Sequence, residues 1–262
     1  MKRMVDLKEI SDGRLYSSGD MVRADCHDCT GCSDCCRGMG SSIILDPMDI
    51  WRFRLGIGKD FAALMEREIE LGVVDGMVLP NLKMESGQDA CPFLNGEGRC
   101  SVHEFRPGIC RLFPLGRYYE ENGFRYFLQV HECSRKDRGK VKIKKWLGIP
   151  NLKAYENYIL KWHDFLNDCE EALPGLDDKN ARILTLYVLR CFYENRLCHY
   201  MHTFIKHRNY DYSDSTLKNH RRSSDYRRKY CQRNYGSNNS CQHKLHLYSG
   251  AAEAPSSILK IQ

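Results

Sequence analysis

The chain has 262 residues, of which 42% are hydrophobic and 14 are cysteines. A chain of this length can bury one large core or two small ones, so it does not need its cysteines to staple a miniature fold. The net charge of +6 belongs to one end, because residues 206–262 carry eleven Lys and Arg against four Asp and Glu, and residues 1–205 carry twenty-nine against thirty. The charge therefore excludes a generally basic, nucleic-acid-binding domain and leaves only the tail as a basic segment.

The beginning of the sequence contains no continuous apolar run, and no later stretch approaches the length of a membrane span. We therefore expect a cytoplasmic protein with no membrane partner, in which thiols stay reduced. Metal ions are the expected partners of the cysteines, and disulfides in an oxidising compartment are the alternative.

The first elements are predicted from local signals. Residues 1–23 are expected to be a polar lead-in that packs partly against the rest, and residues 41–45 to be extended. Asp followed by Pro predicts a helix over 46–55 that stops at a glycine. Apolar spacing predicts a second helix over 59–71, closed by Gly72.

The later elements are mainly helical. The Asn122-Gly123 pair predicts a hairpin between residues 118–119 and 125–130. Apolar residues at gaps of three and four predict a helix from about residue 150 to Pro174-Gly175, and Asp177 or Asp178 predicts the start of a second one. Three cysteines on or near these faces are expected to be small buried hydrophobes: Cys169, Cys191 and Cys198.

Residues 206–262 are rich in Asn, Ser, Tyr, Arg and His, and we expect them to be disordered. Basic and tyrosine residues together would suit RNA or DNA, so nucleic acid is expected as a partner only through this tail. The abrupt change in composition also suggests the hypothesis that a frameshifted reading frame supplies this end.

Five cysteines lie within eleven residues near the N-terminus, and thiolates at such density are typical of zinc or iron–sulfur sites. Cys26-x2-Cys29-x2-Cys32-x3-Cys36 has the spacing of a bacterial ferredoxin run, with Arg37 where proline is usual. The alternative core is Cys29-x2-Cys32-x2-Cys35-Cys36, which leaves Cys26 as an auxiliary ligand or a spectator. Adjacent cysteines point apart in extended backbone, so we expect more than one metal or one polynuclear cluster.

A second group contains Cys91, Cys100, Cys110 and Cys133. A turn over residues 95–98 is predicted to fold Cys100 towards Cys91, as in a metal-binding knuckle. Together with the four cysteines at 29–36, these thiolates could fill two four-coordinate sites. Closed zinc sites would hold loops together, whereas an iron–sulfur cluster could transfer electrons or bind substrate at an open iron.

Basic and imidazole side chains lie beside these cysteines. Arg37, Arg106 and Arg111 would offset thiolate charge and lower thiol pKa values, which favours metal binding. Arg106 or Arg111 would equally suit an acidic substrate, and surface ion pairing is the alternative. His27, His103 and His131 are candidate ligands or hydrogen-bond donors to sulfur, with a surface position as the alternative.

Four spaced motifs resemble the CxxCxxCC cysteine-cluster family. They are Cys29-x2-Cys32-x2-Cys35-Cys36-Arg37, Cys91-Pro92-Phe93-Leu94, Gly98-Arg99-Cys100-Ser101-Val102-His103, and Arg106-Pro107-Gly108-Ile109-Cys110-Arg111-Leu112-Phe113-Pro114. The resemblance covers about residues 24–135 and extends through the helices to about 200. It implies a zinc- or iron-chelating domain, a frequent description as an iron–sulfur protein, and kinship with flagellin lysine N-methylase.

Carried over position by position, the resemblance implies these ligands: Cys29, Cys32, Cys35, Cys36, Cys91, Cys100, Cys110 and Cys133. Cys26 lies outside the core pattern of the family. S-adenosylmethionine is expected only by family analogy, because the sequence has neither a Gly-x-Gly-x-x-Gly loop nor a Cys-x3-Cys-x2-Cys run.

We therefore predict a loop-rich α+β protein. Its parts are a lead-in (1–23), a metal-binding domain with short strands and helices (24–140), a helical hairpin that buttresses it (141–205) and the tail (206–262). The first functional hypothesis is a redox or protein-modifying, methylase-like enzyme with an iron–sulfur (4Fe–4S) cluster and a protein substrate. The alternative is a non-catalytic, zinc-stabilised module that binds a protein partner.

Overall fold

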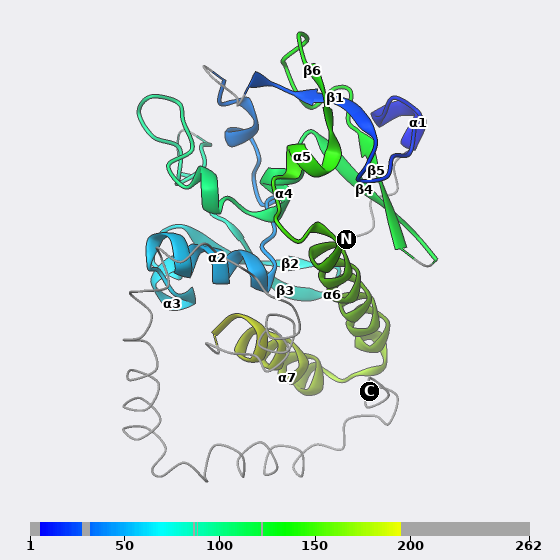
Figure 1. The fold of residues 1–262 in the computed structure, drawn as a ribbon. Coiled ribbons are helices and arrows are strands. Elements are labelled where there is room, and N and C mark those ends of the chain that lie inside the picture. The colour runs from blue at the N-terminus through cyan, green and yellow to red at the C-terminus, as the bar shows by residue number, and fades with distance from the viewer. Residues whose placement is uncertain (1–5, 28–31, 86, 88, 122, 195–262) are drawn as a thin grey trace. The chain divides into compact units, whose positions relative to one another are not determined.

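In the part of the chain that the structure describes, helices are mixed with three small antiparallel sheets, each of two strands, which confirms the predicted α+β class (Figure 1). The computed structural model describes residues 6–27, 32–85, 87, 89–121 and 123–194. Residues 1–204 belong to one compact unit. The tail at 206–262 and Cys198 lie outside the described residues, and the division into parts stays a prediction.

The helices are α1 Leu7–Ile10, α2 Pro47–Ile57, α3 Phe61–Met65, α4 Gly108–Leu112, α5 Ile143–Leu147, α6 Leu152–Ala172 and α7 Asp178–Val188. The strands are β1 Met21–Asp25, β2 Ile69–Val74, β3 Met77–Leu82, β4 Leu115–Glu120, β5 Gly123–Leu128 and β6 Gly139–Lys142. Single turns of 3-10 helix occupy Asp34–Cys36, His103–Phe105 and Leu173–Gly175, and a π-helix, Leu189–Glu194, follows α7.

Helix α2 begins as the Asp-Pro signal predicts. The Asp46 carboxylate accepts the Asp49 N–H, the Asp49 carboxylate accepts the Asp46 N–H, and Pro47 occupies the first turn. The helix ends at Ile57, and Gly58 caps it with a positive φ of 72°. The predicted stop at Gly56 is therefore two residues early.

Gly56 does not end helix α2, and its lack of a side chain instead allows the helix to pack closely against Phe105. A Cβ at this position would lie 2.1 Å from the Phe105 ring, which belongs to the 3-10 turn between Cys100 and Cys110. We expect Gly56→Ala to lower the free energy of unfolding by about 1–3 kcal/mol through overpacking, despite the better helix propensity of alanine. Urea unfolding would measure it. Gly96→Ala is the control, because a Cβ there meets nothing within 4 Å.

The predicted helix over 59–71 is wrong in its second half. Helix α3 ends at Met65, and β2 starts at Ile69 and pairs with β3 around an Asp75-Gly76 turn. Both turn residues have positive φ values, 49° and 81°, as a two-residue hairpin turn requires. Gly72 therefore lies inside a strand and closes no helix. Of the segment at 41–45, which was predicted to be extended, Ser41 lies in a turn and Ile44 pairs with Asn81 of β3.

The hairpin predicted across residues 122–123 is confirmed as β4 and β5, with Tyr118 opposite Arg125. The lead-in prediction did not include strand β1, which pairs with β6 more than a hundred residues later and buries Val22 and Ala24. Local patterns could not reveal this partner.

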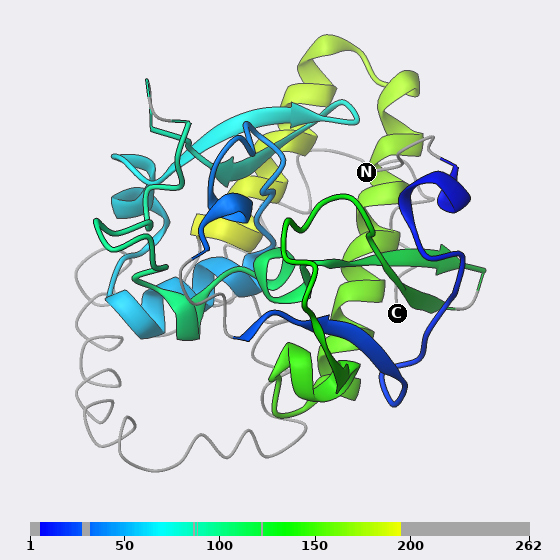
Figure 2. The ribbon, with the colours of Figure 1, turned by 90° about the horizontal axis from the view of Figure 1, so that it is seen from above.

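Two hydrophobic cores are joined by α6. The first contains Leu45, Phe53, Leu64, Ile69, Leu82, Cys169 and Val188, and the second contains Val22, Leu115, Ile143, Leu147, Tyr155 and Ile159. The N-terminal half of α6 supplies the second core and its C-terminal half the first, with Trp162 against both. Figures 1 and 2 show α6 running past both regions towards α7. The C-terminal helices thus buttress the fold as predicted. Cys169 is a buried hydrophobic residue as expected, whereas Cys191 is half-buried.

Along the described chain, no helix combines the length and hydropathy needed to cross a membrane.

Candidate metal centre

Backbone hydrogen bonds join the first cysteine loop to the second cysteine group. The N–H of Cys91 donates to the Cys36 carbonyl at 2.8 Å, and the N–H of Gly38 donates to the Asp89 carbonyl at 2.8 Å. Arg37 and Ala90 form the β-bridge between these two contacts. Cys35 and Cys36, which end a 3-10 turn, are thereby held beside Cys91.

The predicted turn at 95–98 folds Cys100 back towards Cys91. The Asn95 side chain accepts the N–H groups of Glu97 and Arg99, at 3.1 and 2.8 Å. Leu94 and Cys100 form a β-bridge beyond it. This local pairing is the knuckle geometry that the sequence predicted.

Three candidate cysteines accept a backbone N–H from the residue two positions later. Phe93 donates to Cys91, Val102 donates to Cys100 and Arg135 donates to Cys133. Each of these bonds stabilises a thiolate and lowers the pKa of its thiol, although burial dominates. Backbone donors that face sulfur in this way are typical of loops that present thiolates to a metal.

Four thiols lie within electrostatic reach of one another: Cys35, Cys91, Cys100 and Cys110. Burial raises the pKa of Cys91 to about 11, and the charges of Cys100 and Cys35 add to the rise. Burial also raises the pKa of Cys110 well above its usual value, with further contributions from Cys91, Cys35 and Cys100. A hydrogen bond with Cys36 is the largest cause of the raised pKa of Cys35, followed by burial. Without a metal these thiols keep their protons, and a bound cation would displace them.

A second set lies where β1 ends and β6 approaches. The Cys32 sulfur is 3.9 Å from the Ser134 hydroxyl oxygen. Burial raises the pKa of Cys133, and the charges of Cys26 and Cys32 raise it further, which places all three cysteines near one another. Cys29 lies outside the described residues.

All ten described cysteines are free thiols. Within the described ranges, no three His, Cys, Asp or Glu side chains already converge at the distances of a bound ion. The cysteines are therefore gathered into two neighbourhoods without meeting at one point, and the charge of Cys26 reaches both, since it raises the pKa of Cys35 as well as that of Cys133. Sets of soft sulfur donors with backbone N–H support fit zinc or iron, since neither metal needs another ligand type.

The arginines that flank the motifs differ in their surroundings. The Cys36 hydrogen bond and burial raise the pKa of Cys35, and burial raises that of Cys100, so the predicted lowering of these thiol pKa values is not found. The Arg106 charge only opposes these rises, and its Nη1 lies 2.5 Å from His103 Nε2. Burial, followed by the charges of Arg52 and Arg106, lowers the pKa of Arg111 to about 10. Arg37 Nε donates to the Ser33 hydroxyl at 3.4 Å. Of the candidate imidazoles, His27 Nε2 lies 3.9 Å from the Asp137 carboxylate and His131 is exposed.

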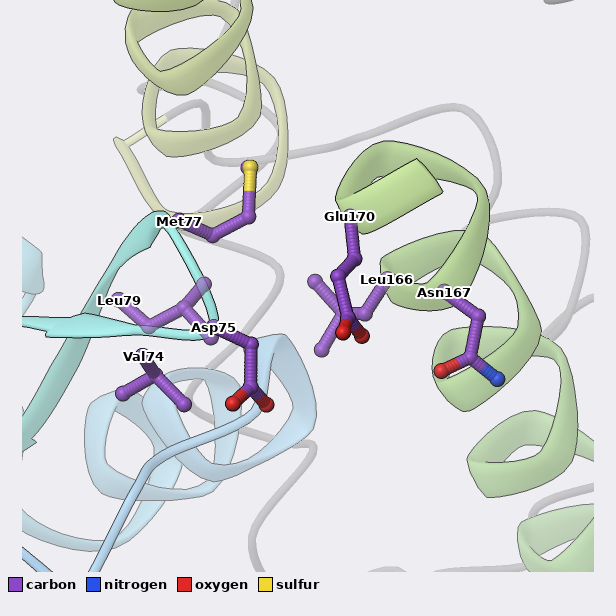
Figure 3. Close-up of a pocket in the computed structure, with 7 residues that line it drawn as sticks. All are labelled: Val74, Asp75, Met77, Leu79, Leu166, Asn167 and Glu170. Carbon is purple, nitrogen blue, oxygen red and sulfur yellow. The ribbon is translucent and has the colours of Figure 1, made fainter. Parts of the chain in front are cut away.

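The hollows beside the β2–β3 turn are not lined by cysteines. One has a volume of about 20 Å³, enough for one water, and lies between the turn and α6, with Asp75 and Glu170 on opposite walls (Figure 3). The other is an open groove of about 360 Å³ lined by Met39, Ser41, Ser42, Ile44 and Val73–Asp75. Neither supplies chemistry that points to a substrate.

A buried carboxylate pair is the feature that sequence reasoning missed. The sequence predicted Asp46 as the cap of a helix but did not single out Asp49, which is only 1% exposed. Burial, followed by the Asp46 charge, raises the pKa of Asp49 to about 7, against the lowering effect of Arg52 and the Gly108 N–H. The Asp46-x-x-Asp49 spacing signals a capping box, but nothing local signals its burial.

Residues 28–134 match a family model, CxxCxxCC, whose description is "Putative zinc- or iron-chelating domain". The match confirms the resemblance seen in the motifs and covers less than half of the chain. Residues 28–134 are thus similar to the CxxCxxCC domain, and the class of function that its description gives is zinc or iron chelation. Comparison with curated proteins and with solved structures gives no match.

Proposed function

We propose that this chain binds metal through two thiolate sets, and that the first set, Cys35, Cys91, Cys100 and Cys110, is the principal centre. The observation that carries the proposal is the junction of the two cysteine segments by the Cys91–Cys36 backbone hydrogen bond and the Arg37–Ala90 bridge. It brings four thiols from three separate segments into one electrostatic neighbourhood. Cys36 adjoins this set through its hydrogen bond with Cys35.

The second set contains Cys26, Cys32 and Cys133, with Cys29 predicted from the sequence alone. Arg135 N–H and the Arg138 charge both favour the thiolate of Cys133.

An iron–sulfur cluster or zinc is the proposed occupant of the principal centre, and the bound group would supply either electron transfer or a structural cross-link. Methyl transfer from S-adenosylmethionine rests on family kinship alone, so we do not include it. Cytoplasmic localisation and a protein partner stay predictions.

The protein should be purified without oxygen and without chelating resin, and its iron, zinc, acid-labile sulfide and visible spectrum measured on one sample. We expect about one metal equivalent or more per chain, since the buried thiols favour a cation over their protons. Iron with sulfide and a visible band that bleaches on reduction would favour the redox hypothesis. Zinc without sulfide would favour the zinc-stabilised binding module. A folded protein without either metal, which takes up neither on reconstitution, would contradict the proposal.

A further inference from the structure

Polar side chains from the start of α2, α4, β4 and α6 form a cluster, which we call the buried polar layer. It consists of Asp46, Asp49 and Arg52 around α2, Arg111 on α4, Arg117 on β4, and Tyr155 on α6 (Figure 1). Asp49 and Tyr155 are among the least exposed residues of the protein, and the Arg52 side chain is 11% exposed. Charged groups at such depth need partners of opposite charge.

The two carboxylates of this layer are already engaged by other donors. Asp49 accepts the Gly108 N–H at 2.7 Å and the Asp46 N–H at 3.1 Å. Asp46 accepts the Asp49 N–H at 3.0 Å and the Tyr158 hydroxyl at 3.2 Å. The distance from Arg52 Nη1 to Asp49 Oδ1 is 3.7 Å, which is longer than any of these hydrogen bonds. Capping α2 and anchoring α4 therefore take most of the acceptor capacity of these carboxylates.

Two of the arginines lie close to the Tyr155 ring. The guanidinium carbons of Arg52 and Arg117 lie 5.1 and 5.9 Å from the centre of the Tyr155 ring. Tyr155, Arg52 and Asp49 are in turn among the groups whose charges act on Arg111. Three arginines thus lie around two carboxylates in this layer.

Several buried donors of the layer have no hydrogen-bond acceptor in the described structure. They are Nε of Arg111, Nε of Arg117 and the hydroxyl of Tyr155. A buried donor left without an acceptor costs about 1–3 kcal/mol, and more when it carries a charge. A water molecule could accept these bonds but carries no charge to match the arginines.

One small anion would satisfy the donors and match the positive charge of the arginines. Guanidinium groups match the oxygens of phosphate and carboxylate, and a tyrosine hydroxyl can donate a further bond. Space at the layer is limited, because a Cβ at Gly108 would lie 2.1 Å from the Tyr155 oxygen. We propose that the buried polar layer binds one small oxyanion, a phosphate or a carboxylate, held by Arg111, Arg117 and the Tyr155 hydroxyl. Asp46 and Asp49 oppose the anion, and the three arginines favour it.

The test is isothermal titration of the purified, metal-loaded protein with inorganic phosphate and, separately, with acetate at matched ionic strength. Saturable binding of one of them is the expected result, and the anion that binds more tightly identifies phosphate or carboxylate as the ligand chemistry. Tyr155→Phe, which keeps the ring beneath the arginines, should weaken binding about tenfold, and Arg117→Gln about a hundredfold.

Arg125→Gln is the matched control, because Arg125 lies on the same hairpin but pairs with Glu120 at the surface, 3.5 Å away. It should bind the anion as the unmodified protein does. Circular dichroism and metal content would check that each variant is folded. No saturable binding of either anion, or equal binding by Tyr155→Phe and Arg125→Gln, would overturn the proposal.

Discussion

Replacing Cys110 with alanine should abolish stoichiometric metal binding and remove most of the stability of the domain. Cys110 lies on α4, close enough to Cys91, Cys35 and Cys100 for all three to act on its pKa. A tetrahedral thiolate site with three ligands opens to water and weakens sharply. Structural zinc contributes about 10–16 kcal/mol at pH 7 in small domains, which is comparable to the about 5–15 kcal/mol of total stability of a typical domain. Metal analysis and urea unfolding on the same preparation would measure both effects.

Cys169→Ala is the matched control for this experiment. Cys169 is also a buried free thiol, but it lies in the first hydrophobic core on α6. Its loss removes one small apolar group, so we expect about 1–2 kcal/mol of destabilisation and full metal content. Full metal content in Cys110→Ala, or equal metal loss in both variants, would remove Cys110 from the proposed centre.

How far the sequence predicts this fold depends on how local the signal is. Helices α2 and α7 follow from Asp caps within one turn, and α6 follows from an apolar period that continues over 21 residues. The error at 59–71 arose because the apolar residues at 61, 64, 65 and 69 fit a helical period. The Asp-Gly pair at 75–76 was the competing hairpin signal, and it decides the structure because both residues adopt positive φ.

The candidate metal centre was likewise predictable from the sequence only where its signals are local. Spacing alone identified the cysteines and the turn that returns Cys100 towards Cys91. It could not indicate which loop lies beside which, because that depends on a backbone bond between Cys36 and Cys91, 55 positions apart in the numbering. The buried polar layer was missed for a related reason: a capping box looks the same in sequence whether solvent or a packed helix covers it.

Asp49→Ala should produce the second large effect, a loss of about 3–5 kcal/mol in the free energy of unfolding. The Asp49 carboxylate ties α2 to the start of α4 through the Gly108 N–H and lies near Arg52. Its removal leaves a buried N–H and a buried cation without their acceptor. Asp177→Ala is the control, because Asp177 caps α7 in the same manner at an exposed position. It should cost about 1 kcal/mol.

The pH dependence of Asp49→Asn tests the same residue by a different readout. Burial raises the pKa of Asp49 to about 7 from its usual 3.8, so the folded chain keeps a proton that the unfolded chain has lost. Between these pH values the folded state binds more protons, and the contribution of Asp49 to stability falls as pH rises. The amide in the Asp49→Asn variant does not titrate, so the stability of the unmodified protein relative to this variant should decline from about pH 4 to about pH 7. A difference that stays constant over this range would mean that Asp49 is ionised throughout and that Arg52 and the backbone donors outweigh its burial.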